Sequence, residues 1–280
     1  MFRRLFDFFI FSSLFIAVCA VFMAAQTSLL FHFPLSFALA GFVFSGSVCS
    51  YNFHWYLTPP DIEVPSVKLA WNISHRTIHF ILFLIGLAGS AFFSILLIHH
   101  WLWLGVTAFF TFLYSAPKIP HPLFYFLRRI AVGKTIFLAL AWTHVTTLLP
   151  LVMTGKSLTT PEILFVVNRF FFIYAICILF DYRDVGEDRK SGIKSLITLL
   201  SERGIDSLFW GSIGIFTVSS IWMHSWFSWD VVAALLLPGF LLCLLYYPSK
   251  KNFSDYRYYF VLDGLMMLSA PLLLLIKFAR

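Results

Sequence analysis

Long apolar runs, separated by short polar segments, dominate the pattern of the chain. Nine of these runs are long enough to cross a bilayer, because about 20 apolar residues in a helix span its hydrocarbon core. Pro34 precedes the second run, Pro59 and Pro60 follow it, and Pro117 and Pro120 follow the fourth, at positions where proline typically limits a helix. The predicted helices cover residues 6–31, 35–56, 78–98, 100–116, 130–151, 162–182, 205–224, 230–247 and 257–278.

The composition excludes a soluble globular protein. Of the 280 residues, 60% are hydrophobic and 20% are aromatic, and a soluble domain of this length has too small an interior to bury so much apolar sequence. We therefore expect an all-α, polytopic membrane protein with nine transmembrane helices, forming a single domain over residues 1–280.

The distribution of positive charge predicts the orientation in the membrane. Only Lys156, Lys277 and Arg280 fall in one set of loops, Arg169 lies inside a predicted helix, and every other lysine and arginine lies on the opposite side. Cytoplasmic loops are enriched in these residues, so we expect a cytoplasmic N-terminus and an external C-terminus in a cell (inner) membrane. The net charge of +7 then reflects cytoplasmic loops that follow this rule, and we expect membrane lipids but no nucleic acid as partners.

The densest run of charge, residues 181–196, follows the sixth predicted helix on the inner side. Asp181, Asp184 and Asp188 are spaced i, i+3, i+7, so they share one face if that helix continues through them. Three neighbouring carboxylates repel one another unless a cation compensates them. Mg²⁺ prefers oxygen ligands and binds carboxylates together with substrate phosphates. The spacing therefore predicts a Mg²⁺ site held by these three aspartates.

Basic residues are interleaved with the three aspartates. Arg183, Arg189, Lys190 and Lys194 have the chemistry to bind the remaining phosphate oxygens. The alternative is a solvated loop whose cations fix topology and whose acids balance them.

This stretch reads D-Y-R-D-x-x-x-D-x-x-x-G-x-K-S-L and resembles the second aspartate-rich motif of the UbiA-type intramembrane prenyltransferases. The resemblance extends to the predicted nine helices and to long inner loops after helices two and six, and so covers nearly the whole chain. It implies a UbiA-like bundle that transfers a prenyl group from a polyprenyl diphosphate to a lipophilic acceptor at the cytoplasmic side. It also implies that Asp181, Asp184 and Asp188 are catalytic and hold Mg²⁺.

The first aspartate-rich motif of that family, N-D-x-x-D-x-x-x-D, is incomplete here. Asn52 matches its leading asparagine, but Phe53, Tyr56 and Pro60 stand where the aspartates are expected. Asn52 and His54 are candidate substrate-binding residues; alternatively, they form an ordinary hydrogen-bond network.

Further acids and bases lie near these motifs. Asp61 follows the first motif and is a substitute ligand only if its loop folds back. The segment from Tyr114 to Lys118 resembles an element common in the superfamily, which makes Lys118 a candidate phosphate contact or a membrane-surface anchor. Lys134 is placed either to reach the same pocket or to extend to the lipid headgroups.

Two other functions stay open, and the incomplete first motif favours the first of them. The chain is alternatively a non-catalytic UbiA-like protein that binds an isoprenoid, a lipid phosphate or a partner protein. A small transporter is a third reading, since polar residues inside membrane helices also line transport paths.

Overall fold

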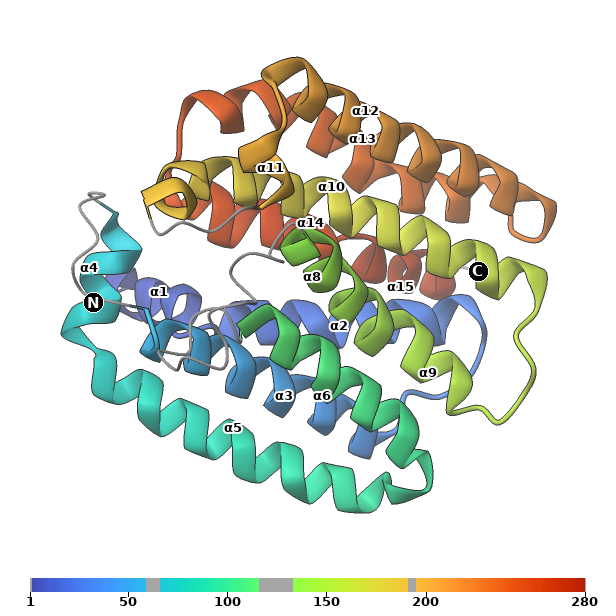
Figure 1. Ribbon diagram of the computed structural model, residues 1–280. Coiled ribbons are helices and arrows are strands. Elements are labelled where there is room, and N and C mark those ends of the chain that lie inside the picture. Colours follow the sequence, from blue (N-terminus) through green and yellow to red (C-terminus); the bar gives the residue numbers. More distant parts are fainter. Residues whose placement is uncertain (1, 59–65, 116–132, 191–194, 280) are drawn as a thin grey trace.

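The computed structural model describes residues 2–58, 66–115, 133–190 and 195–279. Every regular element in these ranges is helical, and the long helices run side by side as a bundle (Figure 1). The first half of the chain contains α1 (Phe2–Phe11), α2 (Leu14–Leu30), α3 (Phe37–Tyr56), α4 (Val67–Ser74), α5 (Arg76–Leu96), η1 (Ile98–His100) and α6 (Trp101–Ser115).

The second half supplies the longest helix. The structure continues with α8 (Lys134–Thr143), η5 (His144–Leu148), α9 (Leu149–Val152), α10 (Thr160–Lys190), α11 (Leu196–Leu199), α12 (Glu202–Trp222), η6 (Met223–Ser225), α13 (Trp229–Lys251), η7 (Arg257–Leu262), α14 (Asp263–Met267) and α15 (Ser269–Ala279).

The structure supports a multi-pass membrane protein but does not confirm nine spans. Six helices of the described residues are long and apolar enough to cross a membrane, and a seventh is added if α1 and α2 form one span bent by 62°. That bend lies at Ser12 and Ser13, where Ser13 has a positive φ of 66°. The helix α3 contains the polar Asn52 and His54, and α6 has only 15 described residues, so neither adds to the count.

Serine side chains begin four of the helices. Ser36, Ser66, Ser195 and Ser201 each accept a hydrogen bond from the backbone N–H three residues later, at the starts of α3, α4, α11 and α12. Such caps satisfy N–H groups that have no partner inside the helix. The short helices α4 and α11, both missed by the apolar pattern, are thus defined locally.

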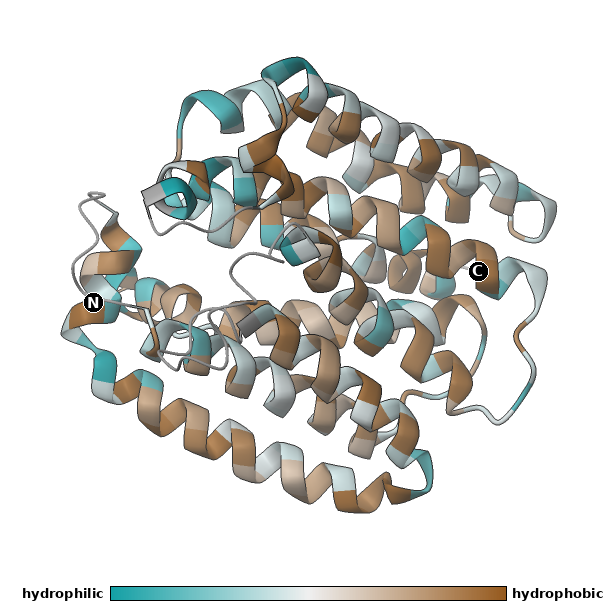
Figure 2. Cartoon of the chain, viewed as in Figure 1, coloured by the Kyte–Doolittle hydropathy of each residue, from teal (hydrophilic) through white to brown (hydrophobic). Residues whose placement is uncertain are grey.

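Burial differs strongly between helices. The central α10 is largely enclosed by its neighbours, whereas the apolar side chains of α5 are mostly exposed along one side of the bundle. Figure 2 shows hydrophobic residues along the middle of the helices and hydrophilic ones gathered toward their ends. Exposed apolar side chains in that middle zone are what a lipid-facing surface requires.

Glycine permits the close packing of α5 on α3. A Cβ atom at Gly86 would lie 2.5 Å from the backbone nitrogen of Cys49. Small residues at such positions let two membrane helices approach closely. This contact fixes α3, which carries one wall of the site described below.

Candidate functional site

A pocket of about 600 Å³ opens among α3, α4, α6, α8, α10 and η7. Its deeper wall is apolar and includes Leu138, Trp142 and Ile176, while its polar wall includes Arg183 and Asp184. A mainly apolar cavity of this size with a few polar groups is typical of a small-molecule site.

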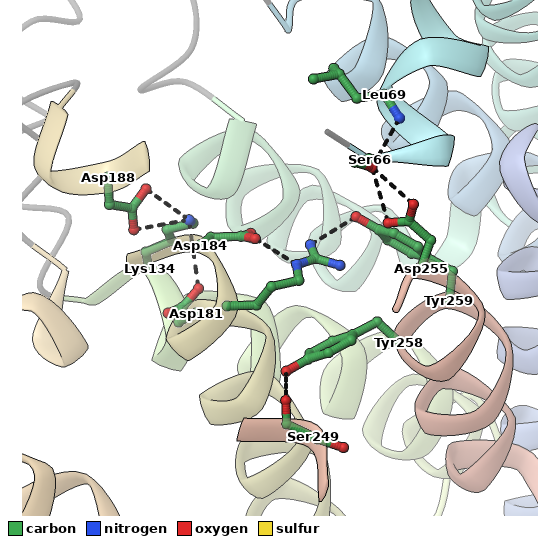
Figure 3. Close-up of polar contacts among 11 residues, drawn as sticks. Ser66, Leu69, Lys134, Asp181, Asp184, Asp188, Ser249, Asp255, Tyr258 and Tyr259 are labelled. Carbon is green, nitrogen blue, oxygen red and sulfur yellow. Dashed lines mark hydrogen bonds and ion pairs between the residues drawn. The ribbon is translucent and has the colours of Figure 1, made fainter. Parts of the chain in front are cut away.

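The helix α10 continues without interruption through the aspartate-rich stretch, as the sequence prediction required. Asp181 and Asp188 both approach Lys134 of α8, whose Nζ lies 3.6 Å from Asp181 Oδ1 and 3.4 Å from Asp188 Oδ2 (Figure 3). Thr135 donates a further hydrogen bond to Asp181. Burial raises the pKa of the Asp188 carboxyl, and the neighbouring Lys134 ammonium opposes this shift. Two of the three predicted aspartates thus share one ammonium group.

The third aspartate has a different cation as its partner. Arg183 Nε donates to Asp184 Oδ1 at 2.7 Å, and Arg183 Nη2 donates to the Tyr259 hydroxyl at 2.8 Å. The guanidinium also lies over the rings of Tyr258 and Tyr259, at 4.8 and 4.7 Å from their centroids. Its Nη1 is buried and has no hydrogen-bond partner among the described residues. Arg183 is therefore held by several contacts, and its Nη1 amino group is unused.

The helix α4 is anchored at the same end of the bundle by Asp255. This carboxylate accepts hydrogen bonds from the Ser66 hydroxyl and from the backbone N–H of Lys68, all at 3.0 Å. The Lys68 ammonium lies over the rings of Tyr259 and Trp55, 3.5 and 4.3 Å from their centroids. Burial lowers the pKa of Lys68 to about 7. These contacts attach α4 to α3, to η7 and to the segment that precedes η7.

The structure separates the two candidates from the first motif. His54 lines the pocket, where its ring stacks on Tyr114 at 5.0 Å. Asn52 instead lies in a buried network: its Nδ2 donates to the Ser12 and Val48 carbonyls, and its Oδ1 lies 2.7 Å from His79 Nδ1. The network alternative from the sequence describes the Asn52 contacts.

Two of the residues that replace the aspartates of the first motif face a neighbouring helix, and the third, Pro60, lies outside the described residues. Phe53 packs on Phe83 and Tyr56 packs on Phe80, both from α5. Neither residue lines the pocket. The incomplete first motif thus serves packing between α3 and α5.

The remaining basic candidates have different outcomes. Arg183 lines the pocket, and Lys190 is the last residue of α10. Lys118 and Lys194 lie outside the described residues, as does Asp61.

Several residues of the pocket were not identified as candidates from the sequence. Asp255, Asp263, Trp55 and Tyr259 line it, yet the acids stand singly in or beside the last apolar run, and aromatic residues are common throughout. An isolated aspartate inside a membrane helix is costly, so Asp263 in particular indicated a functional or paired position.

The arrangement of the carboxylates bears on the expected Mg²⁺. In the part of the chain that the structure describes, no three His, Cys, Asp or Glu side chains are grouped so that they can hold one metal ion. Lys134 lies between Asp181 and Asp188, and Asp184 is paired with Arg183. As arranged, the three aspartates do not fit a shared Mg²⁺, and magnesium binding stays a prediction from the sequence.

Comparison with solved structures identifies the architecture. An apo structure of a UbiA homologue from Aeropyrum pernix K1 matches 94% of this chain and 98% of its own, with a TM-score of 0.60. The chain has a UbiA-type fold. The two sequences are only 13% identical, so the similarity shows the fold alone. No protein-family model and no curated protein matches the sequence.

The UbiA-type fold confirms the resemblance inferred from residues 181–196 at the level of architecture. The chain forms a helical bundle with at least six helices long and apolar enough to cross a membrane among its described residues, and a pocket lies beside this stretch. Substrate and chemistry are separate questions, which depend on the side chains of the pocket.

Proposed function

We propose that the protein binds a polyprenyl diphosphate in the pocket and transfers its prenyl group to a lipophilic acceptor. The observation that carries the proposal is the Arg183 guanidinium at the polar wall of the pocket, with its buried Nη1 unpartnered among the described residues. A buried donor without a partner is costly, and a phosphate oxygen would satisfy it with a strong, charge-assisted hydrogen bond.

The deeper, apolar wall of the pocket suits an isoprenoid chain. Leu138, Trp142, Ile176 and Met266 provide apolar surface deeper in the bundle. Burying such surface favours binding by roughly 25 cal/mol for each Å² of apolar area removed from solvent. A ligand with an anionic head and an apolar tail matches both walls of the pocket.

Transfer of the prenyl group requires that the C–O bond to the diphosphate break and that its electron pair leave with the diphosphate. Arg183 and Lys134 lie at the polar wall, where positive charge stabilises the negative charge that develops on the leaving group. The allylic carbocation left behind needs protection from water, and Trp142 and Tyr51 form an aromatic pair, 6.1 Å apart, on the pocket wall. An acceptor nucleophile bound there would form the new carbon bond and lose a proton.

The expected orientation of the protein in the membrane indicates the side from which substrates enter. The pocket is lined by the end of α10 and by α4, which the charge distribution of the sequence assigns to the cytoplasmic side. Figure 1 marks the N-terminus near α4 and the C-terminus at the other end of the bundle, in agreement with ends on opposite sides. Donor and acceptor would therefore enter from the cytoplasmic leaflet.

A second candidate is a non-catalytic protein that binds the same ligand. It is favoured by Phe53 and Tyr56, which pack on α5 where the family motif expects acids. Loss of half of the acidic residues would impair activation of the leaving group more than binding, because that stabilisation is needed chiefly in the transition state.

The test uses purified protein in nanodiscs with a fluorescent prenyl diphosphate analogue, and mass spectrometry of extracted lipids after incubation with natural donors. Leu138→Trp fills the apolar wall and should reduce affinity for long prenyl chains. Leu237→Trp is the matched control, because Leu237 is exposed on α13. Binding with a new prenylated lipid supports transfer, and binding without product supports the second candidate. Absence of binding to every prenyl diphosphate contradicts both.

A further inference from the structure

Lys134 occupies the space between two acidic side chains that the sequence assigned to a metal. Its ammonium lies 3.4 Å from Asp188 and 3.6 Å from Asp181, and only 15% of its side chain is exposed. Each of the two carboxylate side chains is 6% exposed. The lysine comes from α8 and the acids from α10, so the contact joins two helices through buried charges.

The spacing of the acids suits an ammonium better than a small ion. Asp181 and Asp188 are seven residues apart in α10, and their carboxylates converge on one nitrogen at 3.6 and 3.4 Å. Mg²⁺ requires ligand oxygens at about 2.1 Å in a near-octahedral set. An ammonium on a long flexible side chain attracts both carboxylates from a greater distance. The geometry therefore favours the lysine.

We propose that Lys134 is the resident cation of the Asp181 and Asp188 pair and excludes divalent metal from it. The ammonium has three N–H donors and lies between the two carboxylates, within 3.6 Å of each. Lys134 also lines the pocket, so its third N–H group can donate to an oxygen of a ligand. If the proposed function holds, this half of the site binds the diphosphate without Mg²⁺; the exclusion of metal itself does not depend on that function.

The first measurement is thermal stability in detergent, with and without millimolar Mg²⁺. Wild type should show the same midpoint in Mg²⁺ and in EDTA. Lys134→Met leaves two buried carboxylates without their partner, so its midpoint should fall in EDTA and recover in part in Mg²⁺. The recovery should be lost in the double variant Lys134→Met/Asp188→Asn, which removes one carboxylate.

Lys250→Met is the matched control. Lys250 lies 2.8 Å from both Glu202 and Asp206, so it also joins two acids, but outside the pocket and with Glu202 65% exposed. Its removal should lower the midpoint slightly, with no recovery in Mg²⁺. Equal recovery in both variants would show a general effect of Mg²⁺ on unpaired acids and would overturn the proposal.

A second measurement works on wild type and does not require a folded variant at position 134. Mn²⁺ binding, followed by its electron paramagnetic resonance signal, should be the same in wild type and in Asp188→Asn. Tight Mn²⁺ binding by wild type that is lost in Asp188→Asn would overturn the proposal.

Ligand binding then distinguishes this inference from the proposed function. A prenyl thiodiphosphate should bind wild type in EDTA with less than a tenfold loss of affinity relative to Mg²⁺. Binding that requires Mg²⁺ in wild type contradicts the role of Lys134. Absence of binding in both conditions contradicts the proposed function, and the Mn²⁺ measurement still decides whether Lys134 excludes metal.

Discussion

Arg183 and Asp184 are adjacent in sequence, and their side chains form an ion pair in which Nε lies 2.7 Å from Oδ1. Neighbouring residues of a helix normally point in different directions, yet the guanidinium reaches both Asp184 on its own helix and Tyr259 of η7. The hydroxyl of Tyr259 accepts a hydrogen bond from Arg183 Nη2. The arginine is thereby fixed against the pocket wall.

The first prediction concerns this arginine. Arg183→Gln should weaken binding of a prenyl diphosphate analogue about 10- to 100-fold, because a hydrogen bond to a charged group contributes about 1.5–3 kcal/mol. Isothermal titration in detergent measures the change. Arg203→Gln, which removes an exposed arginine of α12, is the control and should leave affinity unchanged. Similar losses in both variants would indicate a nonspecific charge effect.

The second prediction tests whether Asp184 is the ion-pair partner of Arg183 or a metal ligand. In EDTA, Asp184→Asn should bind the analogue at least as well as wild type, because it frees the Arg183 guanidinium from its ion pair. If Asp184 holds Mg²⁺ as the sequence predicts, affinity measured in Mg²⁺ should instead fall steeply in this variant. Binding curves in both buffers decide between the two results.

The third prediction concerns Asn52, which the sequence placed among candidate substrate-binding residues. Asn52→Ala should lower stability by about 1–3 kcal/mol, because buried partners such as His79 lose a hydrogen bond. Ligand affinity should change less than twofold, since Asn52 lies outside the pocket lining. Denaturant titration and ligand titration on one sample test both parts. A large loss of ligand affinity with unchanged stability would show instead that Asn52 contributes to ligand binding.

The fourth prediction concerns helix packing. Gly86→Ala should lower the free energy of unfolding by about 1–3 kcal/mol, since its Cβ would meet the α3 backbone at Cys49. Gly105→Ala is the control, because nothing lies within 4 Å of a Cβ there. The control should be neutral or slightly stabilising, as alanine favours a helix over glycine. Thermal midpoints of the two variants provide the comparison.

The fifth prediction concerns pH and Lys68. Burial lowers the pKa of Lys68 to about 7, below that of a lysine in the unfolded chain. Above pH 7 the unfolded state therefore holds the proton more tightly, and stability should rise with pH toward the ordinary lysine pKa, by at most about 1.4 kcal/mol per pH unit. Lys68→Met should remove this rise, whereas Lys251→Met, at an exposed position, should keep it. If the stability of Lys68→Met still rises with pH, another group is responsible for the rise.

The sequence by itself determined the class of the protein and the position of its charged stretch. Apolar runs must be buried in lipid or protein, and helix formation satisfies their backbone groups within one segment, so local composition suffices to predict a helical membrane bundle. The resemblance carried by the pattern D-Y-R-D-x-x-x-D likewise indicated the UbiA-type fold, which the similarity to a solved structure with 13% sequence identity confirms at the level of fold. The apolar pattern placed the end of this helix at residue 182, whereas α10 continues to Lys190, so the shared face of the three aspartates depended on the charged stretch being helical.

The tertiary structure decided which side chains meet. Nothing local in the sequence pairs Lys134 with Asp181 and Asp188, because the lysine is 54 residues from Asp188 and reaches it only when α8 packs on α10. Asn52 and His54 are two residues apart on one helix, yet one enters a buried network and the other enters the pocket. The number of spans also depended on packing, since the bend at Ser13 divides one apolar run into two helices. Contacts between distant segments depend on how the helices pack, which the period of one apolar run does not specify.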